Sequence, residues 1–122
     1  MYEVRVQACF SAAHQVRLYD GGLEPIHGHD WRVEAVFRGP ELDRIGVLVD
    51  FVAAEAALRE VTANLHHTRL NDLPFFADVN PTAENLARWV FERLAERLGP
   101  DAPLVGVYVR EAPGCVAGYR VS

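Results

Sequence analysis

The sequence predicts an α+β fold in which a four-stranded antiparallel sheet carries two helices on one face. Three observations lead to this prediction. Alternating apolar residues mark strands near both ends of the chain, two segments with helical periodicity lie between them, and turn residues separate the elements. The expected order is strand, strand, helix, helix, strand, strand, in a single domain that covers residues 1–122.

The first predicted strand covers residues 2–10, where apolar side chains at even positions alternate with polar ones. A period of two is typical of a strand with one buried face. Cys9 falls within this strand, where we expect it to act as a small buried hydrophobic residue. A second alternating run covers residues 31–37, and the Gly-Gly pair and the proline within residues 19–25 indicate a loop between the two strands.

Two helices are predicted in the middle of the chain. Across residues 50–65, apolar residues recur at three- and four-residue spacing, and we expect Asp50 to cap this helix. Thr82 is predicted as the N-cap of the second helix, with Glu84 near the positive end of its dipole. The second helix is expected to stop at Gly99, which precedes a proline.

The last two predicted strands cover residues 104–110 and 116–121 and are joined across Pro113-Gly114. A four-stranded sheet of this kind has two free edges, which proteins usually cover or pair. We therefore expect an oligomer.

Composition excludes several function classes. A net charge of -5 argues against nucleic-acid binding, because phosphate contact needs a basic face. No apolar run reaches the roughly 20 residues that a membrane span needs, and the first residues lack the layout of a signal peptide. Two distant cysteines do not make a disulfide scaffold. These points predict a cytoplasmic protein without nucleic-acid or membrane partners.

His27-Gly28-His29 is the most informative triplet in the chain. Residues two apart in an extended chain point to the same face, so two imidazoles placed in this way can converge on one ion. If the first two strands pair, His14 comes level with the triplet. Three neutral imidazoles suit Zn²⁺ and leave a fourth position open, as in catalytic zinc sites. The alternative is that each histidine is a solvated loop residue.

Six segments, in the same order, resemble the 6-pyruvoyl-tetrahydropterin synthase / 6-carboxy-tetrahydropterin synthase family. The segments are Phe10-Ser11-Ala12-Ala13-His14, His27-Gly28-His29, Gly46-Val47-Leu48-Val49-Asp50-Phe51, His67-Thr68-Arg69-Leu70-Asn71, Asn80-Pro81-Thr82-Ala83-Glu84-Asn85-Leu86-Ala87 and Val109-Arg110-Glu111. The resemblance implies the tunnelling fold (T-fold), in which subunits join edge to edge around a barrel. It also implies a homo-hexamer of two trimers with active sites at subunit interfaces.

The resemblance also implies roles for individual residues. It makes His14, His27 and His29 the zinc ligands and Glu111 the anchor of a pterin ring. A carboxylate can accept two hydrogen bonds from such a ring, one from its amino group and one from its N–H group. Thr82 would bind the other edge of the ring. The alternatives are a surface charge at the end of a strand for Glu111 and a helix cap alone for Thr82.

The chain departs from the family at two catalytic positions. Leu23 stands where the synthases usually carry a catalytic cysteine, and neither Cys9 nor Cys115 replaces it convincingly. His67 matches the family's catalytic histidine, but His66 stands where the orienting aspartate is expected. A neutral imidazole cannot stabilise a neighbouring imidazolium as a carboxylate does.

Glu24 lies three residues before His27, and a branch of the family resembles this arrangement. That branch is associated with cleavage of the pterin side chain to 6-hydroxymethyl-dihydropterin. A carboxylate beside a metal can serve as a general base for such a cleavage. The alternative is that Glu24 is an exposed loop acid.

Three functional hypotheses follow. The first is a zinc-dependent lyase that acts on the side chain of a dihydropterin, either dihydroneopterin or its triphosphate, with Glu24, His66 and His67 as the candidate catalytic residues. The second is a pterin-binding or otherwise repurposed homologue, which Leu23 and His66 favour. A generic zinc hydrolase ranks last, because the sequence specifies no other substrate pocket. The intact set of three histidines favours the first hypothesis.

Overall fold

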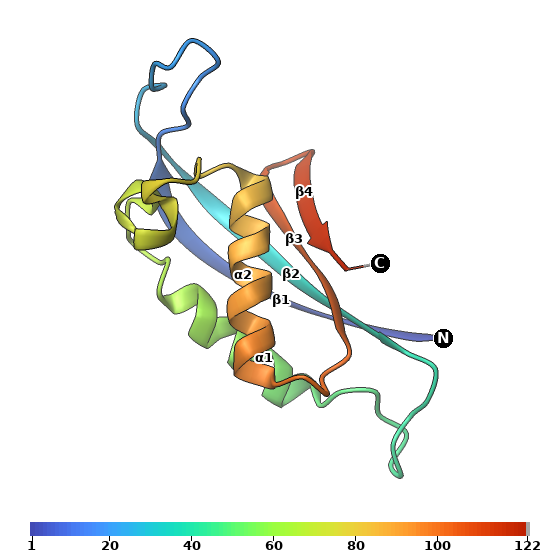
Figure 1. The fold of residues 1–122 in the computed structure, drawn as a ribbon. Coiled ribbons are helices and arrows are strands. Elements are labelled where there is room, and N and C mark those ends of the chain that lie inside the picture. The colour runs from blue at the N-terminus through green and yellow to red at the C-terminus, as the bar shows by residue number, and fades with distance from the viewer. Residues whose placement is uncertain (122) are drawn as a thin grey trace.

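The computed structural model describes residues 1–121 and confirms the predicted fold and order of elements (Figure 1). Four strands form one antiparallel sheet in the order β1-β2-β3-β4. Two helices, α1 and α2, lie across one face of this sheet (Figure 1). The elements in chain order are β1 (Tyr2–His14), β2 (His27–Gly39), α1 (Phe51–Ala63), the 3-10 helices η1 (Leu70–Asp72) and η2 (Pro74–Ala77), α2 (Ala83–Leu98), β3 (Leu104–Ala112) and β4 (Cys115–Arg120).

β1 and β2 are each longer than the sequence pattern predicted. Their pairing runs without interruption from Tyr2 opposite Gly39 to His14 opposite His27. The predicted strands missed residues 11–14 and 27–30 because these residues are mostly small or polar, so the apolar alternation fades there. The extension matters for function because it carries both strands up to the histidines.

Both predicted helix caps are confirmed. The Asp50 side chain accepts a hydrogen bond from the backbone N–H of Val52 at the start of α1. The Thr82 hydroxyl accepts from the backbone N–H of Asn85 at the start of α2. Gly114, in the turn between β3 and β4, has a φ of 83°, which glycine adopts without steric cost. The expectation of a buried Cys9 is wrong, because its side chain lies on the exposed face of β1.

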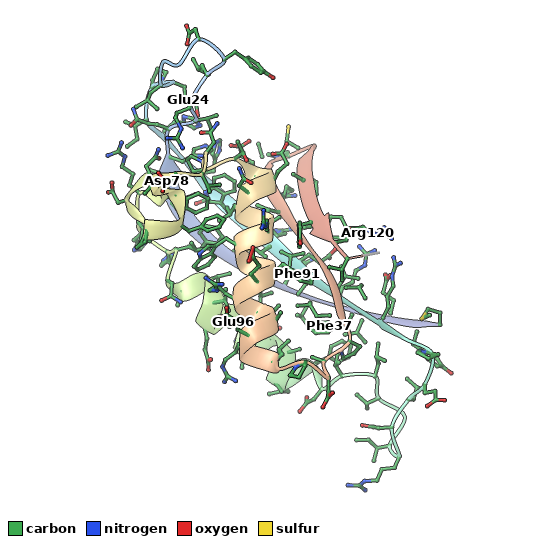
Figure 2. All side chains as sticks on the ribbon, viewed as in Figure 1. Glu24, Phe37, Asp78, Phe91, Glu96 and Arg120 are labelled. Atoms are coloured by element: carbon green, nitrogen blue, oxygen red, sulfur yellow. The ribbon has the colours of Figure 1, made fainter. Side chains whose placement is uncertain are left out.

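The core lies between the sheet and the helices. Its largest members include Trp31 and Phe37 from β2, Leu58 from α1 and Leu94 from α2, all with side chains at most 1 % exposed. Figure 2 shows Glu24 at the end of the molecule where the β1–β2 loop extends, whereas Phe37 lies toward the other end of β2. No helix among residues 1–121 is long and apolar enough to cross a membrane.

Truncating the core should destabilise the protein in proportion to the cavity it opens. Leu58 is 0 % exposed, so Leu58→Ala is expected to lower the free energy of unfolding by about 2–5 kcal/mol. The matched control is Leu42→Ala in the β2–α1 loop, where the side chain is 38 % exposed and the expected change is within about 0.5 kcal/mol. Urea unfolding measures both, and equal losses in the two variants would contradict this assignment of the core.

Candidate metal centre

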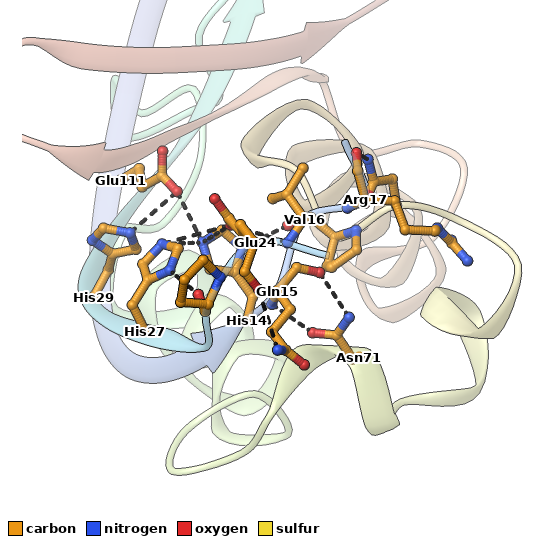
Figure 3. Close-up of polar contacts among 12 residues, drawn as sticks. His14, Gln15, Val16, Arg17, Glu24, His27, His29, Asn71 and Glu111 are labelled. Atoms are coloured by element: carbon orange, nitrogen blue, oxygen red, sulfur yellow. Dashed lines mark hydrogen bonds and ion pairs between the residues drawn. The ribbon is translucent and has the colours of Figure 1, made fainter. Parts of the chain in front are cut away.

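Three strands converge at one end of the sheet and bring four potential metal ligands together. His14 ends β1, His27 begins β2 directly opposite it, and His29 follows two residues later on the same face. Glu111, near the end of β3, joins them, and the ligand atoms of all four lie within 4.8 Å of one another. Figure 3 shows the four side chains directed toward a common point.

The spacing of the ligand atoms suits a tetrahedral ion. His14 Nε2 lies 3.1 Å from His27 Nε2 and 3.1 Å from Glu111 Oε1. His29 Nε2 lies 3.3 Å from Glu111 Oε1. A tetrahedral zinc with ligand distances of about 2.0–2.2 Å separates its ligand atoms by about 3.3–3.6 Å. The observed separations are therefore close to the edges of such a tetrahedron.

Backbone carbonyl groups fix the orientation of two of the imidazoles. His14 Nδ1 lies 2.8 Å from the carbonyl oxygen of Pro81, and His27 Nδ1 lies 3.0 Å from that of Pro25. Because a carbonyl only accepts, each Nδ1 must carry the hydrogen, and each Nε2 then presents its lone pair to the centre. A hydrogen bond of this kind is the usual support of a metal-bound histidine.

The environment of His29 is a further test of whether these residues fit a metal ion. Its Nε2 is buried and makes no hydrogen bond to any residue that the structure describes. Burial lowers the pKa of His29, while the Glu111 carboxylate acts in the opposite direction and His14 and His27 add to the lowering. The lowered pKa favours the neutral imidazole, which is the form that binds metal. A buried ring nitrogen that makes no hydrogen bond, with a lowered pKa that favours the neutral form, fits a metal ligand.

Glu24 lies beside this centre as a fifth polar group. Its Oε1 is 3.8 Å from His27 Nε2 and 4.0 Å from His14 Nε2. The same oxygen accepts a hydrogen bond of 2.9 Å from the backbone N–H of Val16. The side chain is partly exposed, so Glu24 can reach both the centre and a molecule bound at it (Figure 3).

Thr82 lies next to Pro81, whose carbonyl holds His14, and its hydroxyl caps α2. It also borders a depression of about 370 Å³ together with Arg17 and Asn80. A hydroxyl that accepts from the helix still has a hydrogen to donate. The capping role therefore leaves room for the predicted contact with a ligand.

The two neighbouring histidines after α1 lie at the free edge of β1. His66 Nδ1 accepts from the backbone N–H of Ser11, and the backbone N–H of His67 donates to the Ser11 carbonyl. The two rings stack at 3.6 Å between centroids. His67 borders a depression of about 450 Å³ that His29 also lines, whereas His66 borders a different one with Cys9. Of these two histidines, His67 is the one whose depression is also lined by a residue of the candidate metal centre.

Two features of the site had no clear signal in the sequence. Glu111 joins the histidines as a fourth potential ligand, although the motif pattern assigned it to ring binding alone. The carbonyl groups of Pro25 and Pro81 orient the imidazoles, and a backbone acceptor leaves no trace in residue identity.

The chain is similar to known proteins in both sequence and structure. The family model for 6-pyruvoyl tetrahydropterin synthase matches residues 3–122. A dihydroneopterin monophosphate aldolase from Pyrococcus furiosus is 35% identical over 80% of this chain and 79% of its own. A 6-carboxy-5,6,7,8-tetrahydropterin synthase from Bacillus subtilis is 32% identical over 98% and 85%. The structure of the Caenorhabditis elegans 6-pyruvoyl tetrahydropterin synthase superposes with a TM-score of 0.86 at 25% identity, over 99% of this chain and 96% of that one.

Proposed function

Because the chain belongs to the 6-pyruvoyl tetrahydropterin synthase family, we propose that it is a zinc-dependent lyase that acts on the side chain of a dihydropterin. The substrate would be dihydroneopterin or one of its phosphate esters, and the product 6-hydroxymethyl-dihydropterin. The family match and the curated relatives support pterin side-chain processing in general. The aldolase name of the Pyrococcus furiosus relative favours carbon–carbon cleavage over the synthase reactions.

One observation carries the choice of reaction. The carboxylate of Glu24 lies about 4 Å from two imidazole nitrogens of the metal centre, while Leu23, at the position of the family's catalytic cysteine, is exposed and has no titratable group. Glu24 is therefore the proposed general base. A base must lie within reach of the proton that it removes, and a substrate hydroxyl at the centre would meet this condition.

The proposed cleavage balances without an oxidant or a reductant. Glu24 takes the proton of the C2′ hydroxyl, C2′ becomes a carbonyl carbon, and the C1′–C2′ bond breaks. The electron pair of that bond moves into the conjugated dihydropterin ring and returns to C1′ with a proton. Zinc, held by His14, His27 and His29, would lower the pKa of side-chain hydroxyls bound to it.

The stacked histidines are the remaining candidate catalytic residues. His67 borders the same depression as His29 and is the proposed group for returning the proton to C1′. His66 would act only through its stacking on His67. Within residues 1–121, β4 and the part of β1 before Ser11 have no partner strand on their outer edges, which supports the edge-to-edge homo-hexamer that we propose, in which a neighbouring subunit adds to each site.

Glu111 is the proposed pterin anchor, although its Oε1 lies at ligand distance from two of the histidines. Glu111→Gln separates these two roles. If Glu111 binds the ring, KM should rise at least about tenfold with zinc retained, because a neutral amide replaces one charged acceptor with a donor. Zinc content by atomic emission and steady-state kinetics measure the two effects. Loss of zinc from the variant would make Glu111 a metal ligand instead.

The second candidate function is that of a pterin-binding or otherwise repurposed homologue that lacks synthase activity. Two departures favour it. Leu23 stands at the position of the family's catalytic cysteine, and His66 replaces the orienting carboxylate with an imidazole that accepts a hydrogen bond from the Ser11 backbone. This candidate predicts that pterins bind without being converted.

The deciding experiment supplies zinc-loaded protein with dihydroneopterin, its monophosphate and its triphosphate in separate reactions, and identifies the pterin products by mass spectrometry. Formation of 6-hydroxymethyl-dihydropterin supports the lyase. A 6-pyruvoyl or 6-carboxy product would overturn the cleavage proposal and return the chain to the synthase reactions. Binding without any product, with zinc confirmed, would favour the repurposed homologue.

A further inference from the structure

The chain stays extended for three residues beyond the end of β1, and two asparagine side chains hold it there. Asn71 Oδ1 accepts from the backbone N–H of Gln15 at 2.8 Å, and Asn71 Nδ2 donates to the carbonyl of Gln15 at 2.8 Å. Asn80 repeats the arrangement on Arg17, with distances of 2.7 and 3.0 Å. A side-chain amide offers the same donor and acceptor as a peptide group, so each asparagine replaces one residue of a neighbouring strand.

Val16, which lies between Gln15 and Arg17, directs its backbone groups away from the two asparagines. In an extended chain, successive peptide groups point to opposite sides, so Val16 turns from the asparagines toward Glu24. The Val16 N–H donates to Glu24 Oε1 at 2.9 Å, and the Val16 carbonyl accepts from the Glu24 N–H at 3.1 Å. Gln15 adds a third contact, since its side-chain amide donates to the Glu24 carbonyl at 3.2 Å (Figure 3).

The two asparagines are anchored in the body of the fold. Asn71 belongs to η1, next to the fully buried Leu70. The Asn80 carbonyl accepts from the Thr82 backbone N–H at 2.8 Å and from Asn85 Nδ2 at 2.9 Å, which ties it to the first turn of α2. The loop that carries Glu24 is thus fastened to the helical layer through residues 15–17.

We propose that Asn71 and Asn80 are positioning residues, which hold residues 15–17 in register so that the Val16 N–H fixes the Glu24 carboxylate at the metal centre. The proposal rests on the proposed function for the reaction that Glu24 performs. Neither asparagine touches the ligand atoms, so both act on turnover through Glu24 and not through the metal.

The effect on catalysis should appear in kcat. Supporting residues of a metal site typically change activity by about 10–100-fold, and we expect Asn71→Ala and Asn80→Ala each to lower kcat within that range. KM should change less than about threefold, because neither side chain is proposed to bind the pterin ring. Zinc content should remain that of the unaltered protein.

A double-mutant cycle with Glu24→Ala distinguishes an action of the asparagines through Glu24 from a purely structural role. If the asparagines act through Glu24, adding Asn71→Ala or Asn80→Ala to Glu24→Ala should lower kcat less than about twofold further. The matched control is Asn64→Ala, which removes an amide that donates to the carbonyls of Glu60 and Val61 in the last turn of α1 and lies outside the ligand group. It should leave kcat unchanged.

Hydrogen exchange of the Val16 amide gives a second readout that does not need turnover. Both asparagine variants should speed this exchange at least about tenfold relative to the Asn64→Ala control, with exchange in the core of β1 unchanged.

Faster exchange with lowered kcat supports the proposal. A normal kcat in the asparagine variants would overturn the proposal. The same holds if the asparagine substitutions lower kcat as much in the Glu24→Ala background as in the unaltered protein, or if Val16 exchange is unchanged. Absence of turnover in the unaltered protein would instead reject the proposed function, and the exchange rates would still decide whether the asparagines fix Val16.

Discussion

Replacing His27 with alanine should strip the metal from the protein and abolish turnover. His27 Nε2 lies 3.1 Å from His14 Nε2, and its ring is already oriented by the Pro25 carbonyl. With this ligand gone, two histidines remain, which is fewer than the three protein ligands of a catalytic zinc site. Loss of a supporting partner alone costs about 10–100-fold, so loss of a ligand should lower kcat/KM by more than about a hundredfold.

The control for His27→Ala is His66→Ala, which removes an imidazole that bonds to the Ser11 backbone and lies outside the ligand group. It should retain a full complement of zinc by atomic emission. Because His66 is itself a candidate catalytic residue, its comparison with His27→Ala concerns metal content and not rate. Turnover that persists in metal-free His27→Ala protein would reject zinc catalysis altogether.

Replacing Glu24 with alanine should also lower turnover, but with the metal retained. Glu24 Oε1 lies 3.8 Å from His27 Nε2 and 4.0 Å from His14 Nε2, farther than the 3.1 Å between His14 Nε2 and Glu111 Oε1. The three histidines therefore keep their positions without it. Loss of a general base typically costs 10²–10⁴-fold, so turnover should fall at least about a hundredfold.

Glu41→Ala provides the matched control for Glu24, because Glu41 is an exposed acid in the other long loop, between β2 and α1. Its turnover and zinc content should equal those of the unaltered protein. A near-normal rate for Glu24→Ala would make Glu24 an ordinary surface acid. Loss of zinc in that variant would instead assign Glu24 to the ligand set.

The sequence predicted the fold well because its signals are local. The alternation in residues 2–10 and the caps at Asp50 and Thr82 depend on neighbouring residues only, and the structure confirms them. The exposed Cys9 shows the limit of a composition rule, because cysteine is often buried but this one stands at an odd position of β1, on the face away from the helices. Its place in the alternation was the better guide.

The metal centre was predictable in part. The register of two paired strands brings His14 opposite His27, and a two-residue spacing adds His29, so three of the four potential ligands follow from strand geometry. Glu111 arrives from β3, almost a hundred residues after His14, and its approach depends on the pairing of β2 with β3. The asparagine pairs on Gln15 and Arg17 depend on where η1 and the start of α2 pack, which no local pattern specifies.

The central claim is that this chain breaks the C1′–C2′ bond of a dihydropterin side chain. The most direct measurement supplies zinc-loaded protein with dihydroneopterin labelled with ¹³C at C2′ and C3′ and follows the label by mass spectrometry. The label is expected to leave in a two-carbon hydroxyaldehyde, while an unlabelled 6-hydroxymethyl-dihydropterin accumulates in equal amount. Label that stays on a converted pterin would contradict this claim.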